Sequence, residues 1–351
     1  MTWLITGGCG FVGSNLVDAV LAQGGAAVVV DSLMRKGSAD NLAWLRERHG
    51  RDWRFEQFDV RDTDRVAGLV AETRPRVIAH LAGQVAMTTS LEDPRLDFEV
   101  NAGGTLNVLE AVRLRSPETV ILYSSTNKVY GALDHLAYAE TPTRYVVPSH
   151  PNGFDEGLQL DGSSPYGCSK LAAEQYVRDY FRMFGVRSVV FRHSSIYGEH
   201  QFSTFDQGWV GWFCTKAFEL KHDAIESFPI SGTGKQVRDV LHAEDLVGAY
   251  FAAVERIGDT AGEIFNLGGG MANSLSLLEL FAKLESLVGC RMAFTRLDWR
   301  KADQKVFVAD NGKATRCFGW TPGVSTAEGL GRMTAWISEM RDRQRAGRPT
   351  R

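Results

Sequence analysis

Leu4-Ile5-Thr6-Gly7-Gly8-Cys9-Gly10-Phe11-Val12-Gly13 joins a short apolar strand to a glycine-rich turn, and this stretch decides the fold. Gly7, Gly10 and Gly13 follow the spacing G-x-x-G-x-x-G ahead of a helical pattern. Such glycines permit a tight turn, a close approach of backbone to a pyrophosphate, and packing of the helix on its strand. The unpaired N–H groups of the first helical turn, Phe11 and Val12 among them, favour an anion. The stretch predicts a phosphate-binding turn, although alone it also fits an ordinary strand–helix turn.

Acidic residues end the next two predicted strands. Asp31 follows the glycine turn by about twenty residues, where a carboxylate can bond the adenosine ribose hydroxyls. Its charge repels a 2′-phosphate, so it favours NAD over NADP. Asp59 and Val60 end the third strand, where we expect a contact with adenine. These features together predict a dinucleotide site. The Arg35-Lys36 pair weakens the preference for NAD slightly, and we interpret it as a solvated loop.

Short β-branched runs alternate with helical patterns through the first half of the chain. This alternation predicts right-handed βαβ units and a buried parallel sheet. We therefore expect an α/β protein with a Rossmann-type doubly wound parallel sheet and a smaller mixed α/β substrate-binding lobe. The predicted strands are Leu4–Thr6, Ala27–Val30, Phe55–Phe58, Val77–Leu81, Val120–Tyr123 and Val189–Arg192, and the predicted helices are Asn15–Gln23, Asp64–Glu72, Thr105–Arg113 and Lys170–Phe184.

The pattern changes after about residue 194, and 351 residues are enough for two lobes. Residues 199–230 are rich in aromatic side chains and irregular in pattern. We expect strands at Phe228–Ser231, Phe265–Leu267 and Arg291–Arg296, and helices near 244–254, 276–288 and 329–340. The predicted cofactor domain comprises residues 1–193 and about 236–261. The predicted substrate lobe comprises about 194–235 and 262–345, and 346–351 form a tail.

Composition argues against several classes of protein. The net charge of −3 favours neither a nucleic acid nor an anionic membrane as a partner. The longest apolar runs are too short to cross a bilayer. The five cysteines are scattered and contain no C-x-x-C pair, which argues against a disulfide scaffold and against a zinc site. We expect a cytoplasmic protein without a metal.

Tyr166-Gly167-Cys168-Ser169-Lys170 has the spacing Y-x-x-x-K, which places the tyrosine and the lysine on one face of a helix. The ammonium, helped by a positively charged nicotinamide, is expected to lower the pKa of Tyr166, so that the phenol takes a hydroxyl proton as hydride leaves the carbon. Thr126 closes the fifth strand at the carboxyl edge, where open α/β sheets bind ligands, and is expected to hold the reacting oxygen. Each pattern alone also fits a surface pair or a turn cap.

In this order the motifs resemble the extended short-chain dehydrogenase/reductases, an NAD-dependent family that includes nucleotide-sugar epimerases and dehydratases. The resemblance covers nearly the whole chain. It implies that Arg238 and Arg300 clamp the diphosphate of a nucleotide sugar, a task that suits guanidinium groups. It further implies a cofactor site that adds Leu81, Ala82, Gly83, Asn101, His193, Tyr166 and Lys170 to the residues above, and a substrate site that adds Gln84, Thr126, Asn127, Ser195 and Asp303.

The residues after Thr126 narrow the choice within the family. Dehydratases of the family carry an Asp-Glu pair there, whereas this chain has Asn127-Lys128, so dehydration is disfavoured. Longer stretches, such as Tyr123 to Gly131 and Asp206 to Cys214, are similar to epimerases that invert C2 of a CDP-linked 3,6-dideoxyhexose. The resemblance implies a transient 2-keto sugar and return of the hydride by the same NAD.

Other functions remain open at this point. A C2-epimerase of another nucleotide hexose, such as an NDP-glucose, fits the same motifs. So does a 4-epimerase or another oxidoreductase of a nucleotide sugar. A non-catalytic cofactor sensor is disfavoured, since a sensor does not need Thr126, Tyr166 and Lys170 together. We expect a CDP-hexose as the partner and a homo-oligomer as the assembly.

Overall fold

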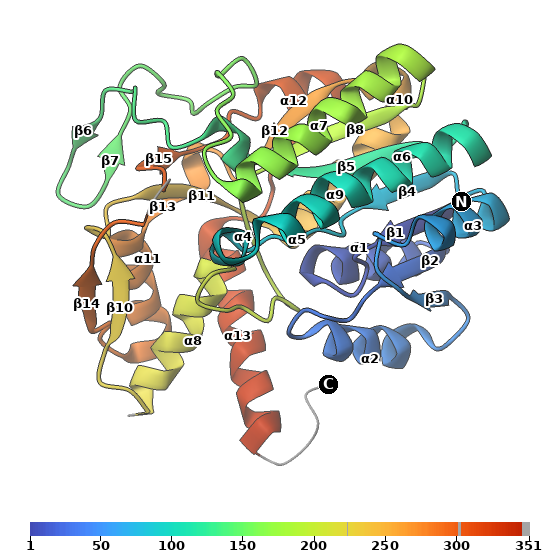
Figure 1. Ribbon diagram of the computed structural model, residues 1–351. Helices are drawn as coiled ribbons and strands as arrows, with labels where there is room; N and C mark the ends of the chain where they lie inside the picture. Colours follow the sequence, from blue (N-terminus) through green and yellow to red (C-terminus); the bar gives the residue numbers. More distant parts are fainter. Residues whose placement is uncertain (223, 301–302, 346–351) are drawn as a thin grey trace.

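The computed structural model describes residues 1–222, 224–300 and 303–345. A seven-stranded parallel sheet forms the centre of the larger lobe, in the order β12-β8-β5-β4-β1-β2-β3 (Figure 1). The strand order runs in opposite directions on the two sides of β1, which is the arrangement of a doubly wound sheet. The predicted α/β class and Rossmann-type sheet are confirmed. The strands are β1 (Thr2–Thr6), β2 (Ala26–Asp31), β3 (Arg54–Gln57), β4 (Val77–His80), β5 (Val120–Thr126), β8 (Ser188–His193) and β12 (Ile264–Leu267).

Helices cover both faces of this sheet. Alternate residues of β1 serve the two faces: Trp3 and Ile5 join one hydrophobic core and Leu4 joins the other, because successive side chains of a strand point to opposite sides. The first core is closed by α1 (Phe11–Ala22), α2 (Ser38–His49), α9 (Ala243–Glu255) and α12 (Gly312–Phe318), and the second by α3 (Thr63–Thr73), α6 (Gly104–Arg115) and α7 (Pro165–Phe184). The larger lobe also holds α4 (Met87–Glu92), α5 (Pro94–Phe98), the π-helix η1 (Glu99–Gly103) and α10 (Ile257–Thr260).

The smaller lobe lies at the carboxyl ends of the strands of this sheet and contains two short sheets (Figure 1). One pairs β10 (Phe228–Ser231) with β14 (Phe294–Leu297), and the other joins β13 (Ser274–Ser276), β11 (Val237–His242), β15 (Val306–Phe307) and β9 (Ser195–Tyr197). Its helices are α8 (Trp209–Lys221), α11 (Leu277–Leu284), the π-helix η4 (Glu285–Gly289) and α13 (Thr326–Arg345). A hairpin of β6 (Ala139–Glu140) and β7 (Tyr145–Val146) and the 3-10 turns η2 (Asn127–Tyr130) and η3 (Met271–Asn273) complete the fold.

Several parts of the structure differ from the sequence prediction. Residues 199–230 are not irregular throughout, because they contain α8, which buries Val210, Phe213 and Ala217 on one face. Aromatic residues on its other faces hide this helical spacing. The strand β12 and the helix α12, which the predicted division places in the substrate lobe, instead lie with the seven-stranded sheet, where β12 pairs with β8 and α12 packs on the first core. The strand β11, which the same division places in the cofactor domain, pairs with β13 and β15 of the smaller lobe. The predicted tail, 346–351, lies outside the described residues.

The first residues of some helices also differ from the prediction, and the start of α7 affects the site. The helix α7 begins at Pro165 rather than at Lys170. Ser164 caps it by accepting a hydrogen bond from the Gly167 N–H at 3.0 Å, and proline is well suited to the first helical position. Tyr166 therefore lies in the first turn of α7, close to the carboxyl edge of the sheet.

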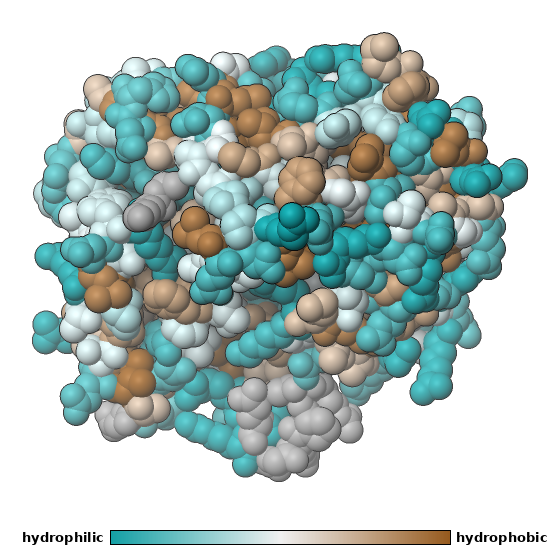
Figure 2. Space-filling model, viewed as in Figure 1, coloured by the Kyte–Doolittle hydropathy of each residue, from teal (hydrophilic) through white to brown (hydrophobic). Residues whose placement is uncertain are grey.

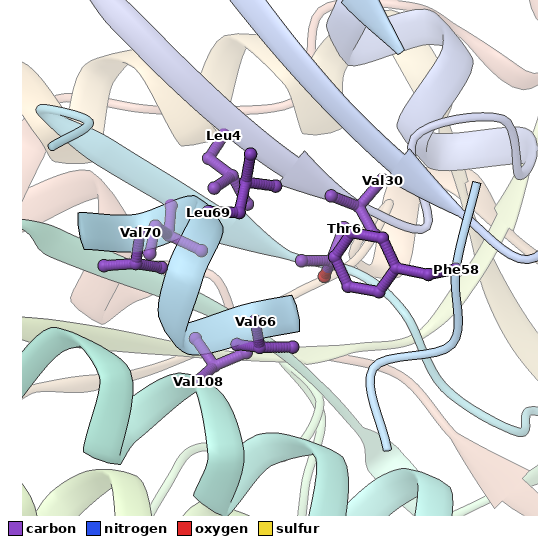
Figure 3. Close-up of a pocket in the computed structure, with 9 residues that line it drawn as sticks. Leu4, Thr6, Val30, Phe58, Val66, Leu69, Val70 and Val108 are labelled. Carbon is purple, nitrogen blue, oxygen red and sulfur yellow. The ribbon is translucent and has the colours of Figure 1, made fainter. Parts of the chain in front are cut away.

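A small apolar cavity lies inside the larger lobe, between the sheet and α3 (Figure 3). Leu4, Val30 and Leu69 are among the side chains that line it, and Thr6 supplies a polar atom at one end. It is a space within the hydrophobic core. No helix among the described residues is long and apolar enough to span a membrane. The same residues contain no group of three His, Cys, Asp or Glu side chains that could hold a metal ion.

Candidate active site

The glycine turn between β1 and α1 brings three backbone segments into close contact. Gly7 has φ of 69°, and a Cβ there would lie 2.7 Å from the Ala82 nitrogen. A Cβ on Gly13 would lie 2.1 Å from the Gly7 oxygen. No described side chain caps the start of α1, whose N-cap is Gly10. The N–H groups of the first turn, including those of Phe11 and Val12, are therefore available to an anion such as a pyrophosphate.

Asp31 ends β2 and holds the glycine turn in place. Its carboxylate accepts hydrogen bonds from the Cys9 N–H at 2.9 Å and from the Leu33 N–H at 2.8 Å. Burial raises the pKa of Asp31, and these bonds oppose that effect. A carboxylate has about four acceptor positions, so capacity for ribose hydroxyls remains beside the turn.

Asp59 follows β3 and is held by Arg61, whose Nη2 lies 2.9 Å from its Oδ2. Burial acts to raise the pKa of Asp59, but the hydrogen bonds from Arg61 outweigh it and lower the pKa overall. The next residue, Val60, packs under Gly104, where a Cβ would lie 2.7 Å from its Cγ2. The sequence did not indicate that Arg61 is the partner of Asp59.

The segment after β4 forms the floor of the site. Leu81 and Ala82 lie against the glycine turn. At Gly83, a Cβ would lie 2.9 Å from Asn101 Oδ1 and 3.9 Å from Lys170 Nζ. A larger residue at position 83 would therefore clash with the side-chain amide of Asn101, while Lys170 lies at ordinary contact distance. The structure thus brings together residues from β4, η1 and α7 that the sequence predicted as one cofactor site.

The predicted catalytic residues converge at the carboxyl edge of the sheet. Thr126 ends β5, and its hydroxyl lies close enough to the phenol of Tyr166 to lower the pKa of that phenol. Lys170 lies one turn farther along α7 and donates from Nζ to the Ser124 carbonyl at 2.5 Å. Its Nζ also lies 4.4 Å from the centre of the Tyr123 ring. The lysine is thus fixed against β5.

The surroundings of Tyr166 act on its pKa in addition to the expected effect of Lys170 and a positively charged nicotinamide. Burial raises the phenol pKa to about 12, the hydrogen bond from Thr126 opposes this rise, and the charge of Asp97 adds to it. Burial also lowers the pKa of Lys170 to about 7, against the opposing charges of Asp97 and Glu174. Arg35, expected in a solvated loop, is close enough to Tyr166 for its positive charge to favour the phenolate.

A buried polar cluster that the sequence did not reveal lies beneath these residues. Asp97 is fully buried and accepts hydrogen bonds from Ser169, from Gln84 Nε2 at 2.9 Å and from Asn101 Nδ2 at 3.3 Å. Ser169 lies inside the Y-x-x-x-K stretch, but no local pattern marks Asp97. Gln84, predicted to bind substrate, uses both amide N–H groups internally, on Asp97 and on the Ala86 carbonyl. The side chain of Gln84 therefore forms part of the floor of the site.

His193 ends β8, and its ring is enclosed by protein. Its Nδ1 lies 3.2 Å from Ser124 Oγ and its Nε2 lies 3.2 Å from the Tyr250 hydroxyl. Burial lowers the pKa of His193 to about 3, so the ring is neutral at physiological pH. Ser195, two residues on, accepts a hydrogen bond from Trp209 Nε1 at 2.9 Å, which ties the edge of the sheet to α8.

Predicted substrate residues gather where the smaller lobe meets β5. Arg238 donates to Asp303 Oδ1 at 2.7 Å, and Lys128 Nζ lies 3.4 Å from the same oxygen. Arg300 is near enough for its charge to act on Lys128 and Asp303, and its guanidinium lies 4.6 Å from the centre of the Phe205 ring.

The amide of Asn127 faces Gln304 beside this group. Asn127 Nδ2 lies 3.4 Å from Gln304 Oε1, and Gln304 Nε2 donates to the Gly131 carbonyl at 2.8 Å. Both side chains are buried. The position after Thr126, where the resemblance leads us to expect a carboxylic acid in a dehydratase, thus holds an amide that is fixed by a second amide, and neither group can donate or remove a proton readily.

Comparisons with known proteins agree with this geometry. Residues 3–268 match the NAD dependent epimerase/dehydratase family. The chain is 54% identical over 340 residues to CDP-paratose 2-epimerase of Salmonella typhi, covering 97% of this chain and 100% of that protein. It is 32% identical to a UDP-glucose 4-epimerase of Mycolicibacterium smegmatis, covering 94% and 96% of the two chains.

Solved structures give the same result. The UDP-glucose 4-epimerase of Thermotoga maritima, solved with UDP-glucose, is 28% identical and superposes with a TM-score of 0.81, covering 97% of this chain and 99% of that one. The UDP-glucose 4-epimerase of Thermus thermophilus, solved with NAD, is 28% identical with a TM-score of 0.79, covering 96% and 99%.

Proposed function

The chain belongs to the NAD dependent epimerase/dehydratase family, and we propose that it inverts C2 of a CDP-linked hexose, converting CDP-paratose to CDP-tyvelose. The observation that carries this proposal is 54% identity over the full length of a CDP-paratose 2-epimerase. The Asn127-Lys128 pair supports it, because no carboxylic acid for dehydration follows Thr126.

The residues present fit NAD as the cofactor. Gly7 and Gly13 allow the tight backbone packing of the phosphate turn, because a Cβ at either position would clash with neighbouring backbone, and the open N-terminus of α1 suits a pyrophosphate. Asp31 suits the adenosine ribose, and Lys170 suits the nicotinamide ribose. When bound, NAD⁺ supplies a hydride acceptor that can return the hydride to the same carbon, so that the reaction has no net redox change.

Tyr166 is the proposed base for the hydroxyl at C2. As the hydrogen of C2 leaves with its electron pair, the phenolate of Tyr166 takes the hydroxyl proton and the C–O bond becomes a carbonyl. Thr126 holds this oxygen beside the phenol. When the hydrogen is returned to the opposite face of the sugar, Tyr166 gives the proton back to the oxygen. The 2-keto sugar must turn between these two steps, while its diphosphate stays held by Arg238 and Arg300.

The phenol must lose its proton before it can act, and its surroundings bear on that step. A pKa of about 12 leaves little phenolate at neutral pH. The positive charge of Arg35 already favours the phenolate. An additional positive charge near the phenol would lower its pKa further. We therefore expect Tyr166 to become an effective base only in the complex with the oxidised cofactor.

Nuclear magnetic resonance of a panel of nucleotide sugars tests the proposal. The purified protein is incubated with CDP-paratose and with UDP- and GDP-hexoses in D₂O. We expect inversion at C2 of CDP-paratose without uptake of deuterium at C2, since hydride is returned internally. Inversion at C4, or inversion at C2 of only a UDP- or GDP-sugar, would contradict the proposed substrate. Tyr166→Phe serves as the inactive control.

We also infer a homo-oligomer that forms through the outer helices of the larger lobe. Apolar side chains on α4, α5 and α7 are about half exposed or more, namely Leu91, Phe98, Tyr176, Met183 and Phe184. Figure 2 shows hydrophobic residues interspersed with hydrophilic ones over the face that carries these helices. Light scattering after size-exclusion chromatography should show more than one chain per particle, and Phe98→Asp should reduce that number.

We place the protein in the cytoplasm. All five cysteines are free thiols in the structure, which is the usual state in a reducing compartment. Fractionation of the source cells with an antibody against the protein tests this location.

A further inference from the structure

Lys128 belongs to a cluster of charges that the proposed mechanism does not yet use. Its ammonium lies 3.4 Å from Asp303 Oδ1, and Arg238 donates to the same oxygen at 2.7 Å. The side chains of Lys128 and Asp303 are each 20% exposed, and that of Arg238 is 11% exposed. Asp303 is therefore already paired closely with Arg238. The longer contact with Lys128 leaves hydrogen-bond donors of its ammonium available. Within the described residues, Lys128 Nζ makes this one hydrogen bond out of the three that an ammonium can donate.

The charges in the cluster do not balance. Lys128, Arg238 and Arg300 contribute three positive charges and Asp303 one negative charge, which leaves a net charge of two positive. Burial lowers the pKa of Lys128, and the charges of the two arginines add to this effect. A diphosphate that links a nucleoside to a sugar carries about two negative charges, one on each phosphate. Such a group would neutralise the cluster and would offer acceptors to the remaining ammonium protons.

The backbone places Lys128 next to the reacting centre. Its N–H donates to Thr126 Oγ1 at 3.2 Å, and the two residues are joined through the start of η2. Its side chain points from there toward Arg238 and Asp303 in the smaller lobe. Lys128 is therefore the cation of the cluster that is attached most directly to the catalytic strand β5.

The chemistry of the sugar makes this position significant. In a nucleotide hexose the diphosphate is attached to C1. C2 is bonded to C1, whereas C4 lies across the ring from it. A diphosphate held near Thr126 favours oxidation at C2, and one held farther away favours oxidation at C4.

We propose that Lys128 is a third cationic ligand of the substrate diphosphate and that it holds this group close enough to Thr126 to select C2 for oxidation. The first part concerns any nucleotide diphosphate that enters the cleft. The second part rests on the proposed function.

Calorimetric titration with nucleotides alone tests the first part. CDP and CMP are titrated into the NAD-loaded protein, with UDP and UMP as a second pair. In Lys128→Met we expect CDP to bind at least about tenfold more weakly and CMP to bind within about twofold of the wild type, because CMP lacks the second phosphate. Lys128→Arg should restore most of the affinity for CDP, which also shows that a variant at this position folds.

A matched control is Lys313→Met, which removes a lysine that is likewise paired with a carboxylate, that of Glu263. It should leave the affinity for both nucleotides unchanged. Equal losses for CDP and CMP in Lys128→Met, or no loss for either, would overturn the assignment of Lys128 to the diphosphate. A wild type that binds UDP and not CDP would instead contradict the base in the proposed function, and the UDP and UMP pair would then decide the role of Lys128.

The products formed from CDP-paratose test the second part, because this sugar carries hydroxyls at both C2 and C4. We expect Lys128→Met to lower the rate of inversion at C2 by more than about tenfold and to raise the ratio of C4-inverted to C2-inverted product. An unchanged ratio would overturn the selection of C2 by Lys128. A wild type that does not invert C2 at all would contradict the proposed function, while the nucleotide titrations would still decide whether Lys128 contacts the diphosphate.

Discussion

The carboxylate of Asp97 accepts a hydrogen bond from Ser169, the residue that immediately precedes Lys170 on the catalytic helix. Gln84 and Asn101 donate to the same carboxylate. The bond between Ser169 and Asp97 ties α7 to α5, and the bond from Gln84 joins the loop after β4 to the same carboxylate. The negative charge of the Asp97 carboxylate also raises the pKa of both Lys170 and Tyr166. Asp97 is therefore a positioning residue that also sets the protonation of the two catalytic groups.

Asp97→Asn is expected to move the pH profile of kcat/KM toward lower pH. The substitution keeps the shape of the side chain and removes the charge, so that the pKa values of Lys170 and Tyr166 both fall. A shift of about one pH unit in each limb is the expected size for a neighbouring buried charge. Asp179→Asn, which removes an exposed carboxylate from the same helix, should leave the profile in place. A lower melting temperature with an unchanged profile would limit Asp97 to a structural role.

Tyr166→Phe is expected to lower kcat by at least about a hundredfold, since a positioned proton transfer typically contributes that much. The melting temperature and the binding of NAD should change little, because the ring remains. Tyr176→Phe removes the hydroxyl of an exposed tyrosine on the same helix, and its kcat should match the wild type. A near-normal kcat in Tyr166→Phe would remove Tyr166 from the role of base.

The sequence predicted the sheet and the backbone parts of the site for a clear physical reason. The turn at Gly7 and the strand end at Asp31 depend on local constraints, namely positive φ, close approach of backbone and a carboxylate at a strand end. Such constraints are visible as residue types at fixed spacing. Thr126, Tyr166 and Lys170 were predicted for the same reason, because a strand end and a helical repeat bring them together.

Burial that depends on contacts between segments distant in the sequence could not be predicted in the same way. Asp97 and Ser169 meet only because α5 packs beside α7, and nothing in the stretch around Asp97 indicates a buried acid. The effect of burial on Tyr166 could not be predicted from the sequence either, because burial opposes ionisation of the phenol and its extent depends on packing. The amphipathic face of α8 was missed since aromatic residues surround it.

His80 should make the protein less stable in acid. Burial lowers the pKa of His80 to about 3 from an ordinary value of 6.5. Between these values the unfolded chain binds a proton that the folded chain does not, so stability is lost as pH falls below 6.5. His80→Gln should reduce the loss of unfolding free energy between about pH 7.5 and about pH 5.5 by about 1 kcal/mol. Urea titrations at both pH values measure it, with the exposed His135→Gln as control. Equal losses in wild type and His80→Gln would contradict the prediction.

Glu174 and Arg192 form a buried ion pair whose side chains are 0% and 2% exposed. Glu174 lies one turn beyond Lys170 on α7, and it also accepts a hydrogen bond from Ser125 on β5 at 3.0 Å. Arg192 lies on β8 and donates to the Tyr130 hydroxyl at 2.8 Å. The pair therefore joins the catalytic helix to the two strands beneath it. Removal of one partner leaves a buried charge without compensation.

Glu174→Leu is expected to lower the free energy of unfolding by about 3–5 kcal/mol, measured by urea titration. Combining it with Arg192→Met should recover a large part of that loss, because no uncompensated charge then remains in the core. Glu118→Gln removes the acid of the exposed pair with Arg187 and should leave stability nearly unchanged. If the double variant were as unstable as the sum of the single variants, the cost would come from lost packing rather than from an unpaired charge, and the pair could not be what fixes α7 against β5.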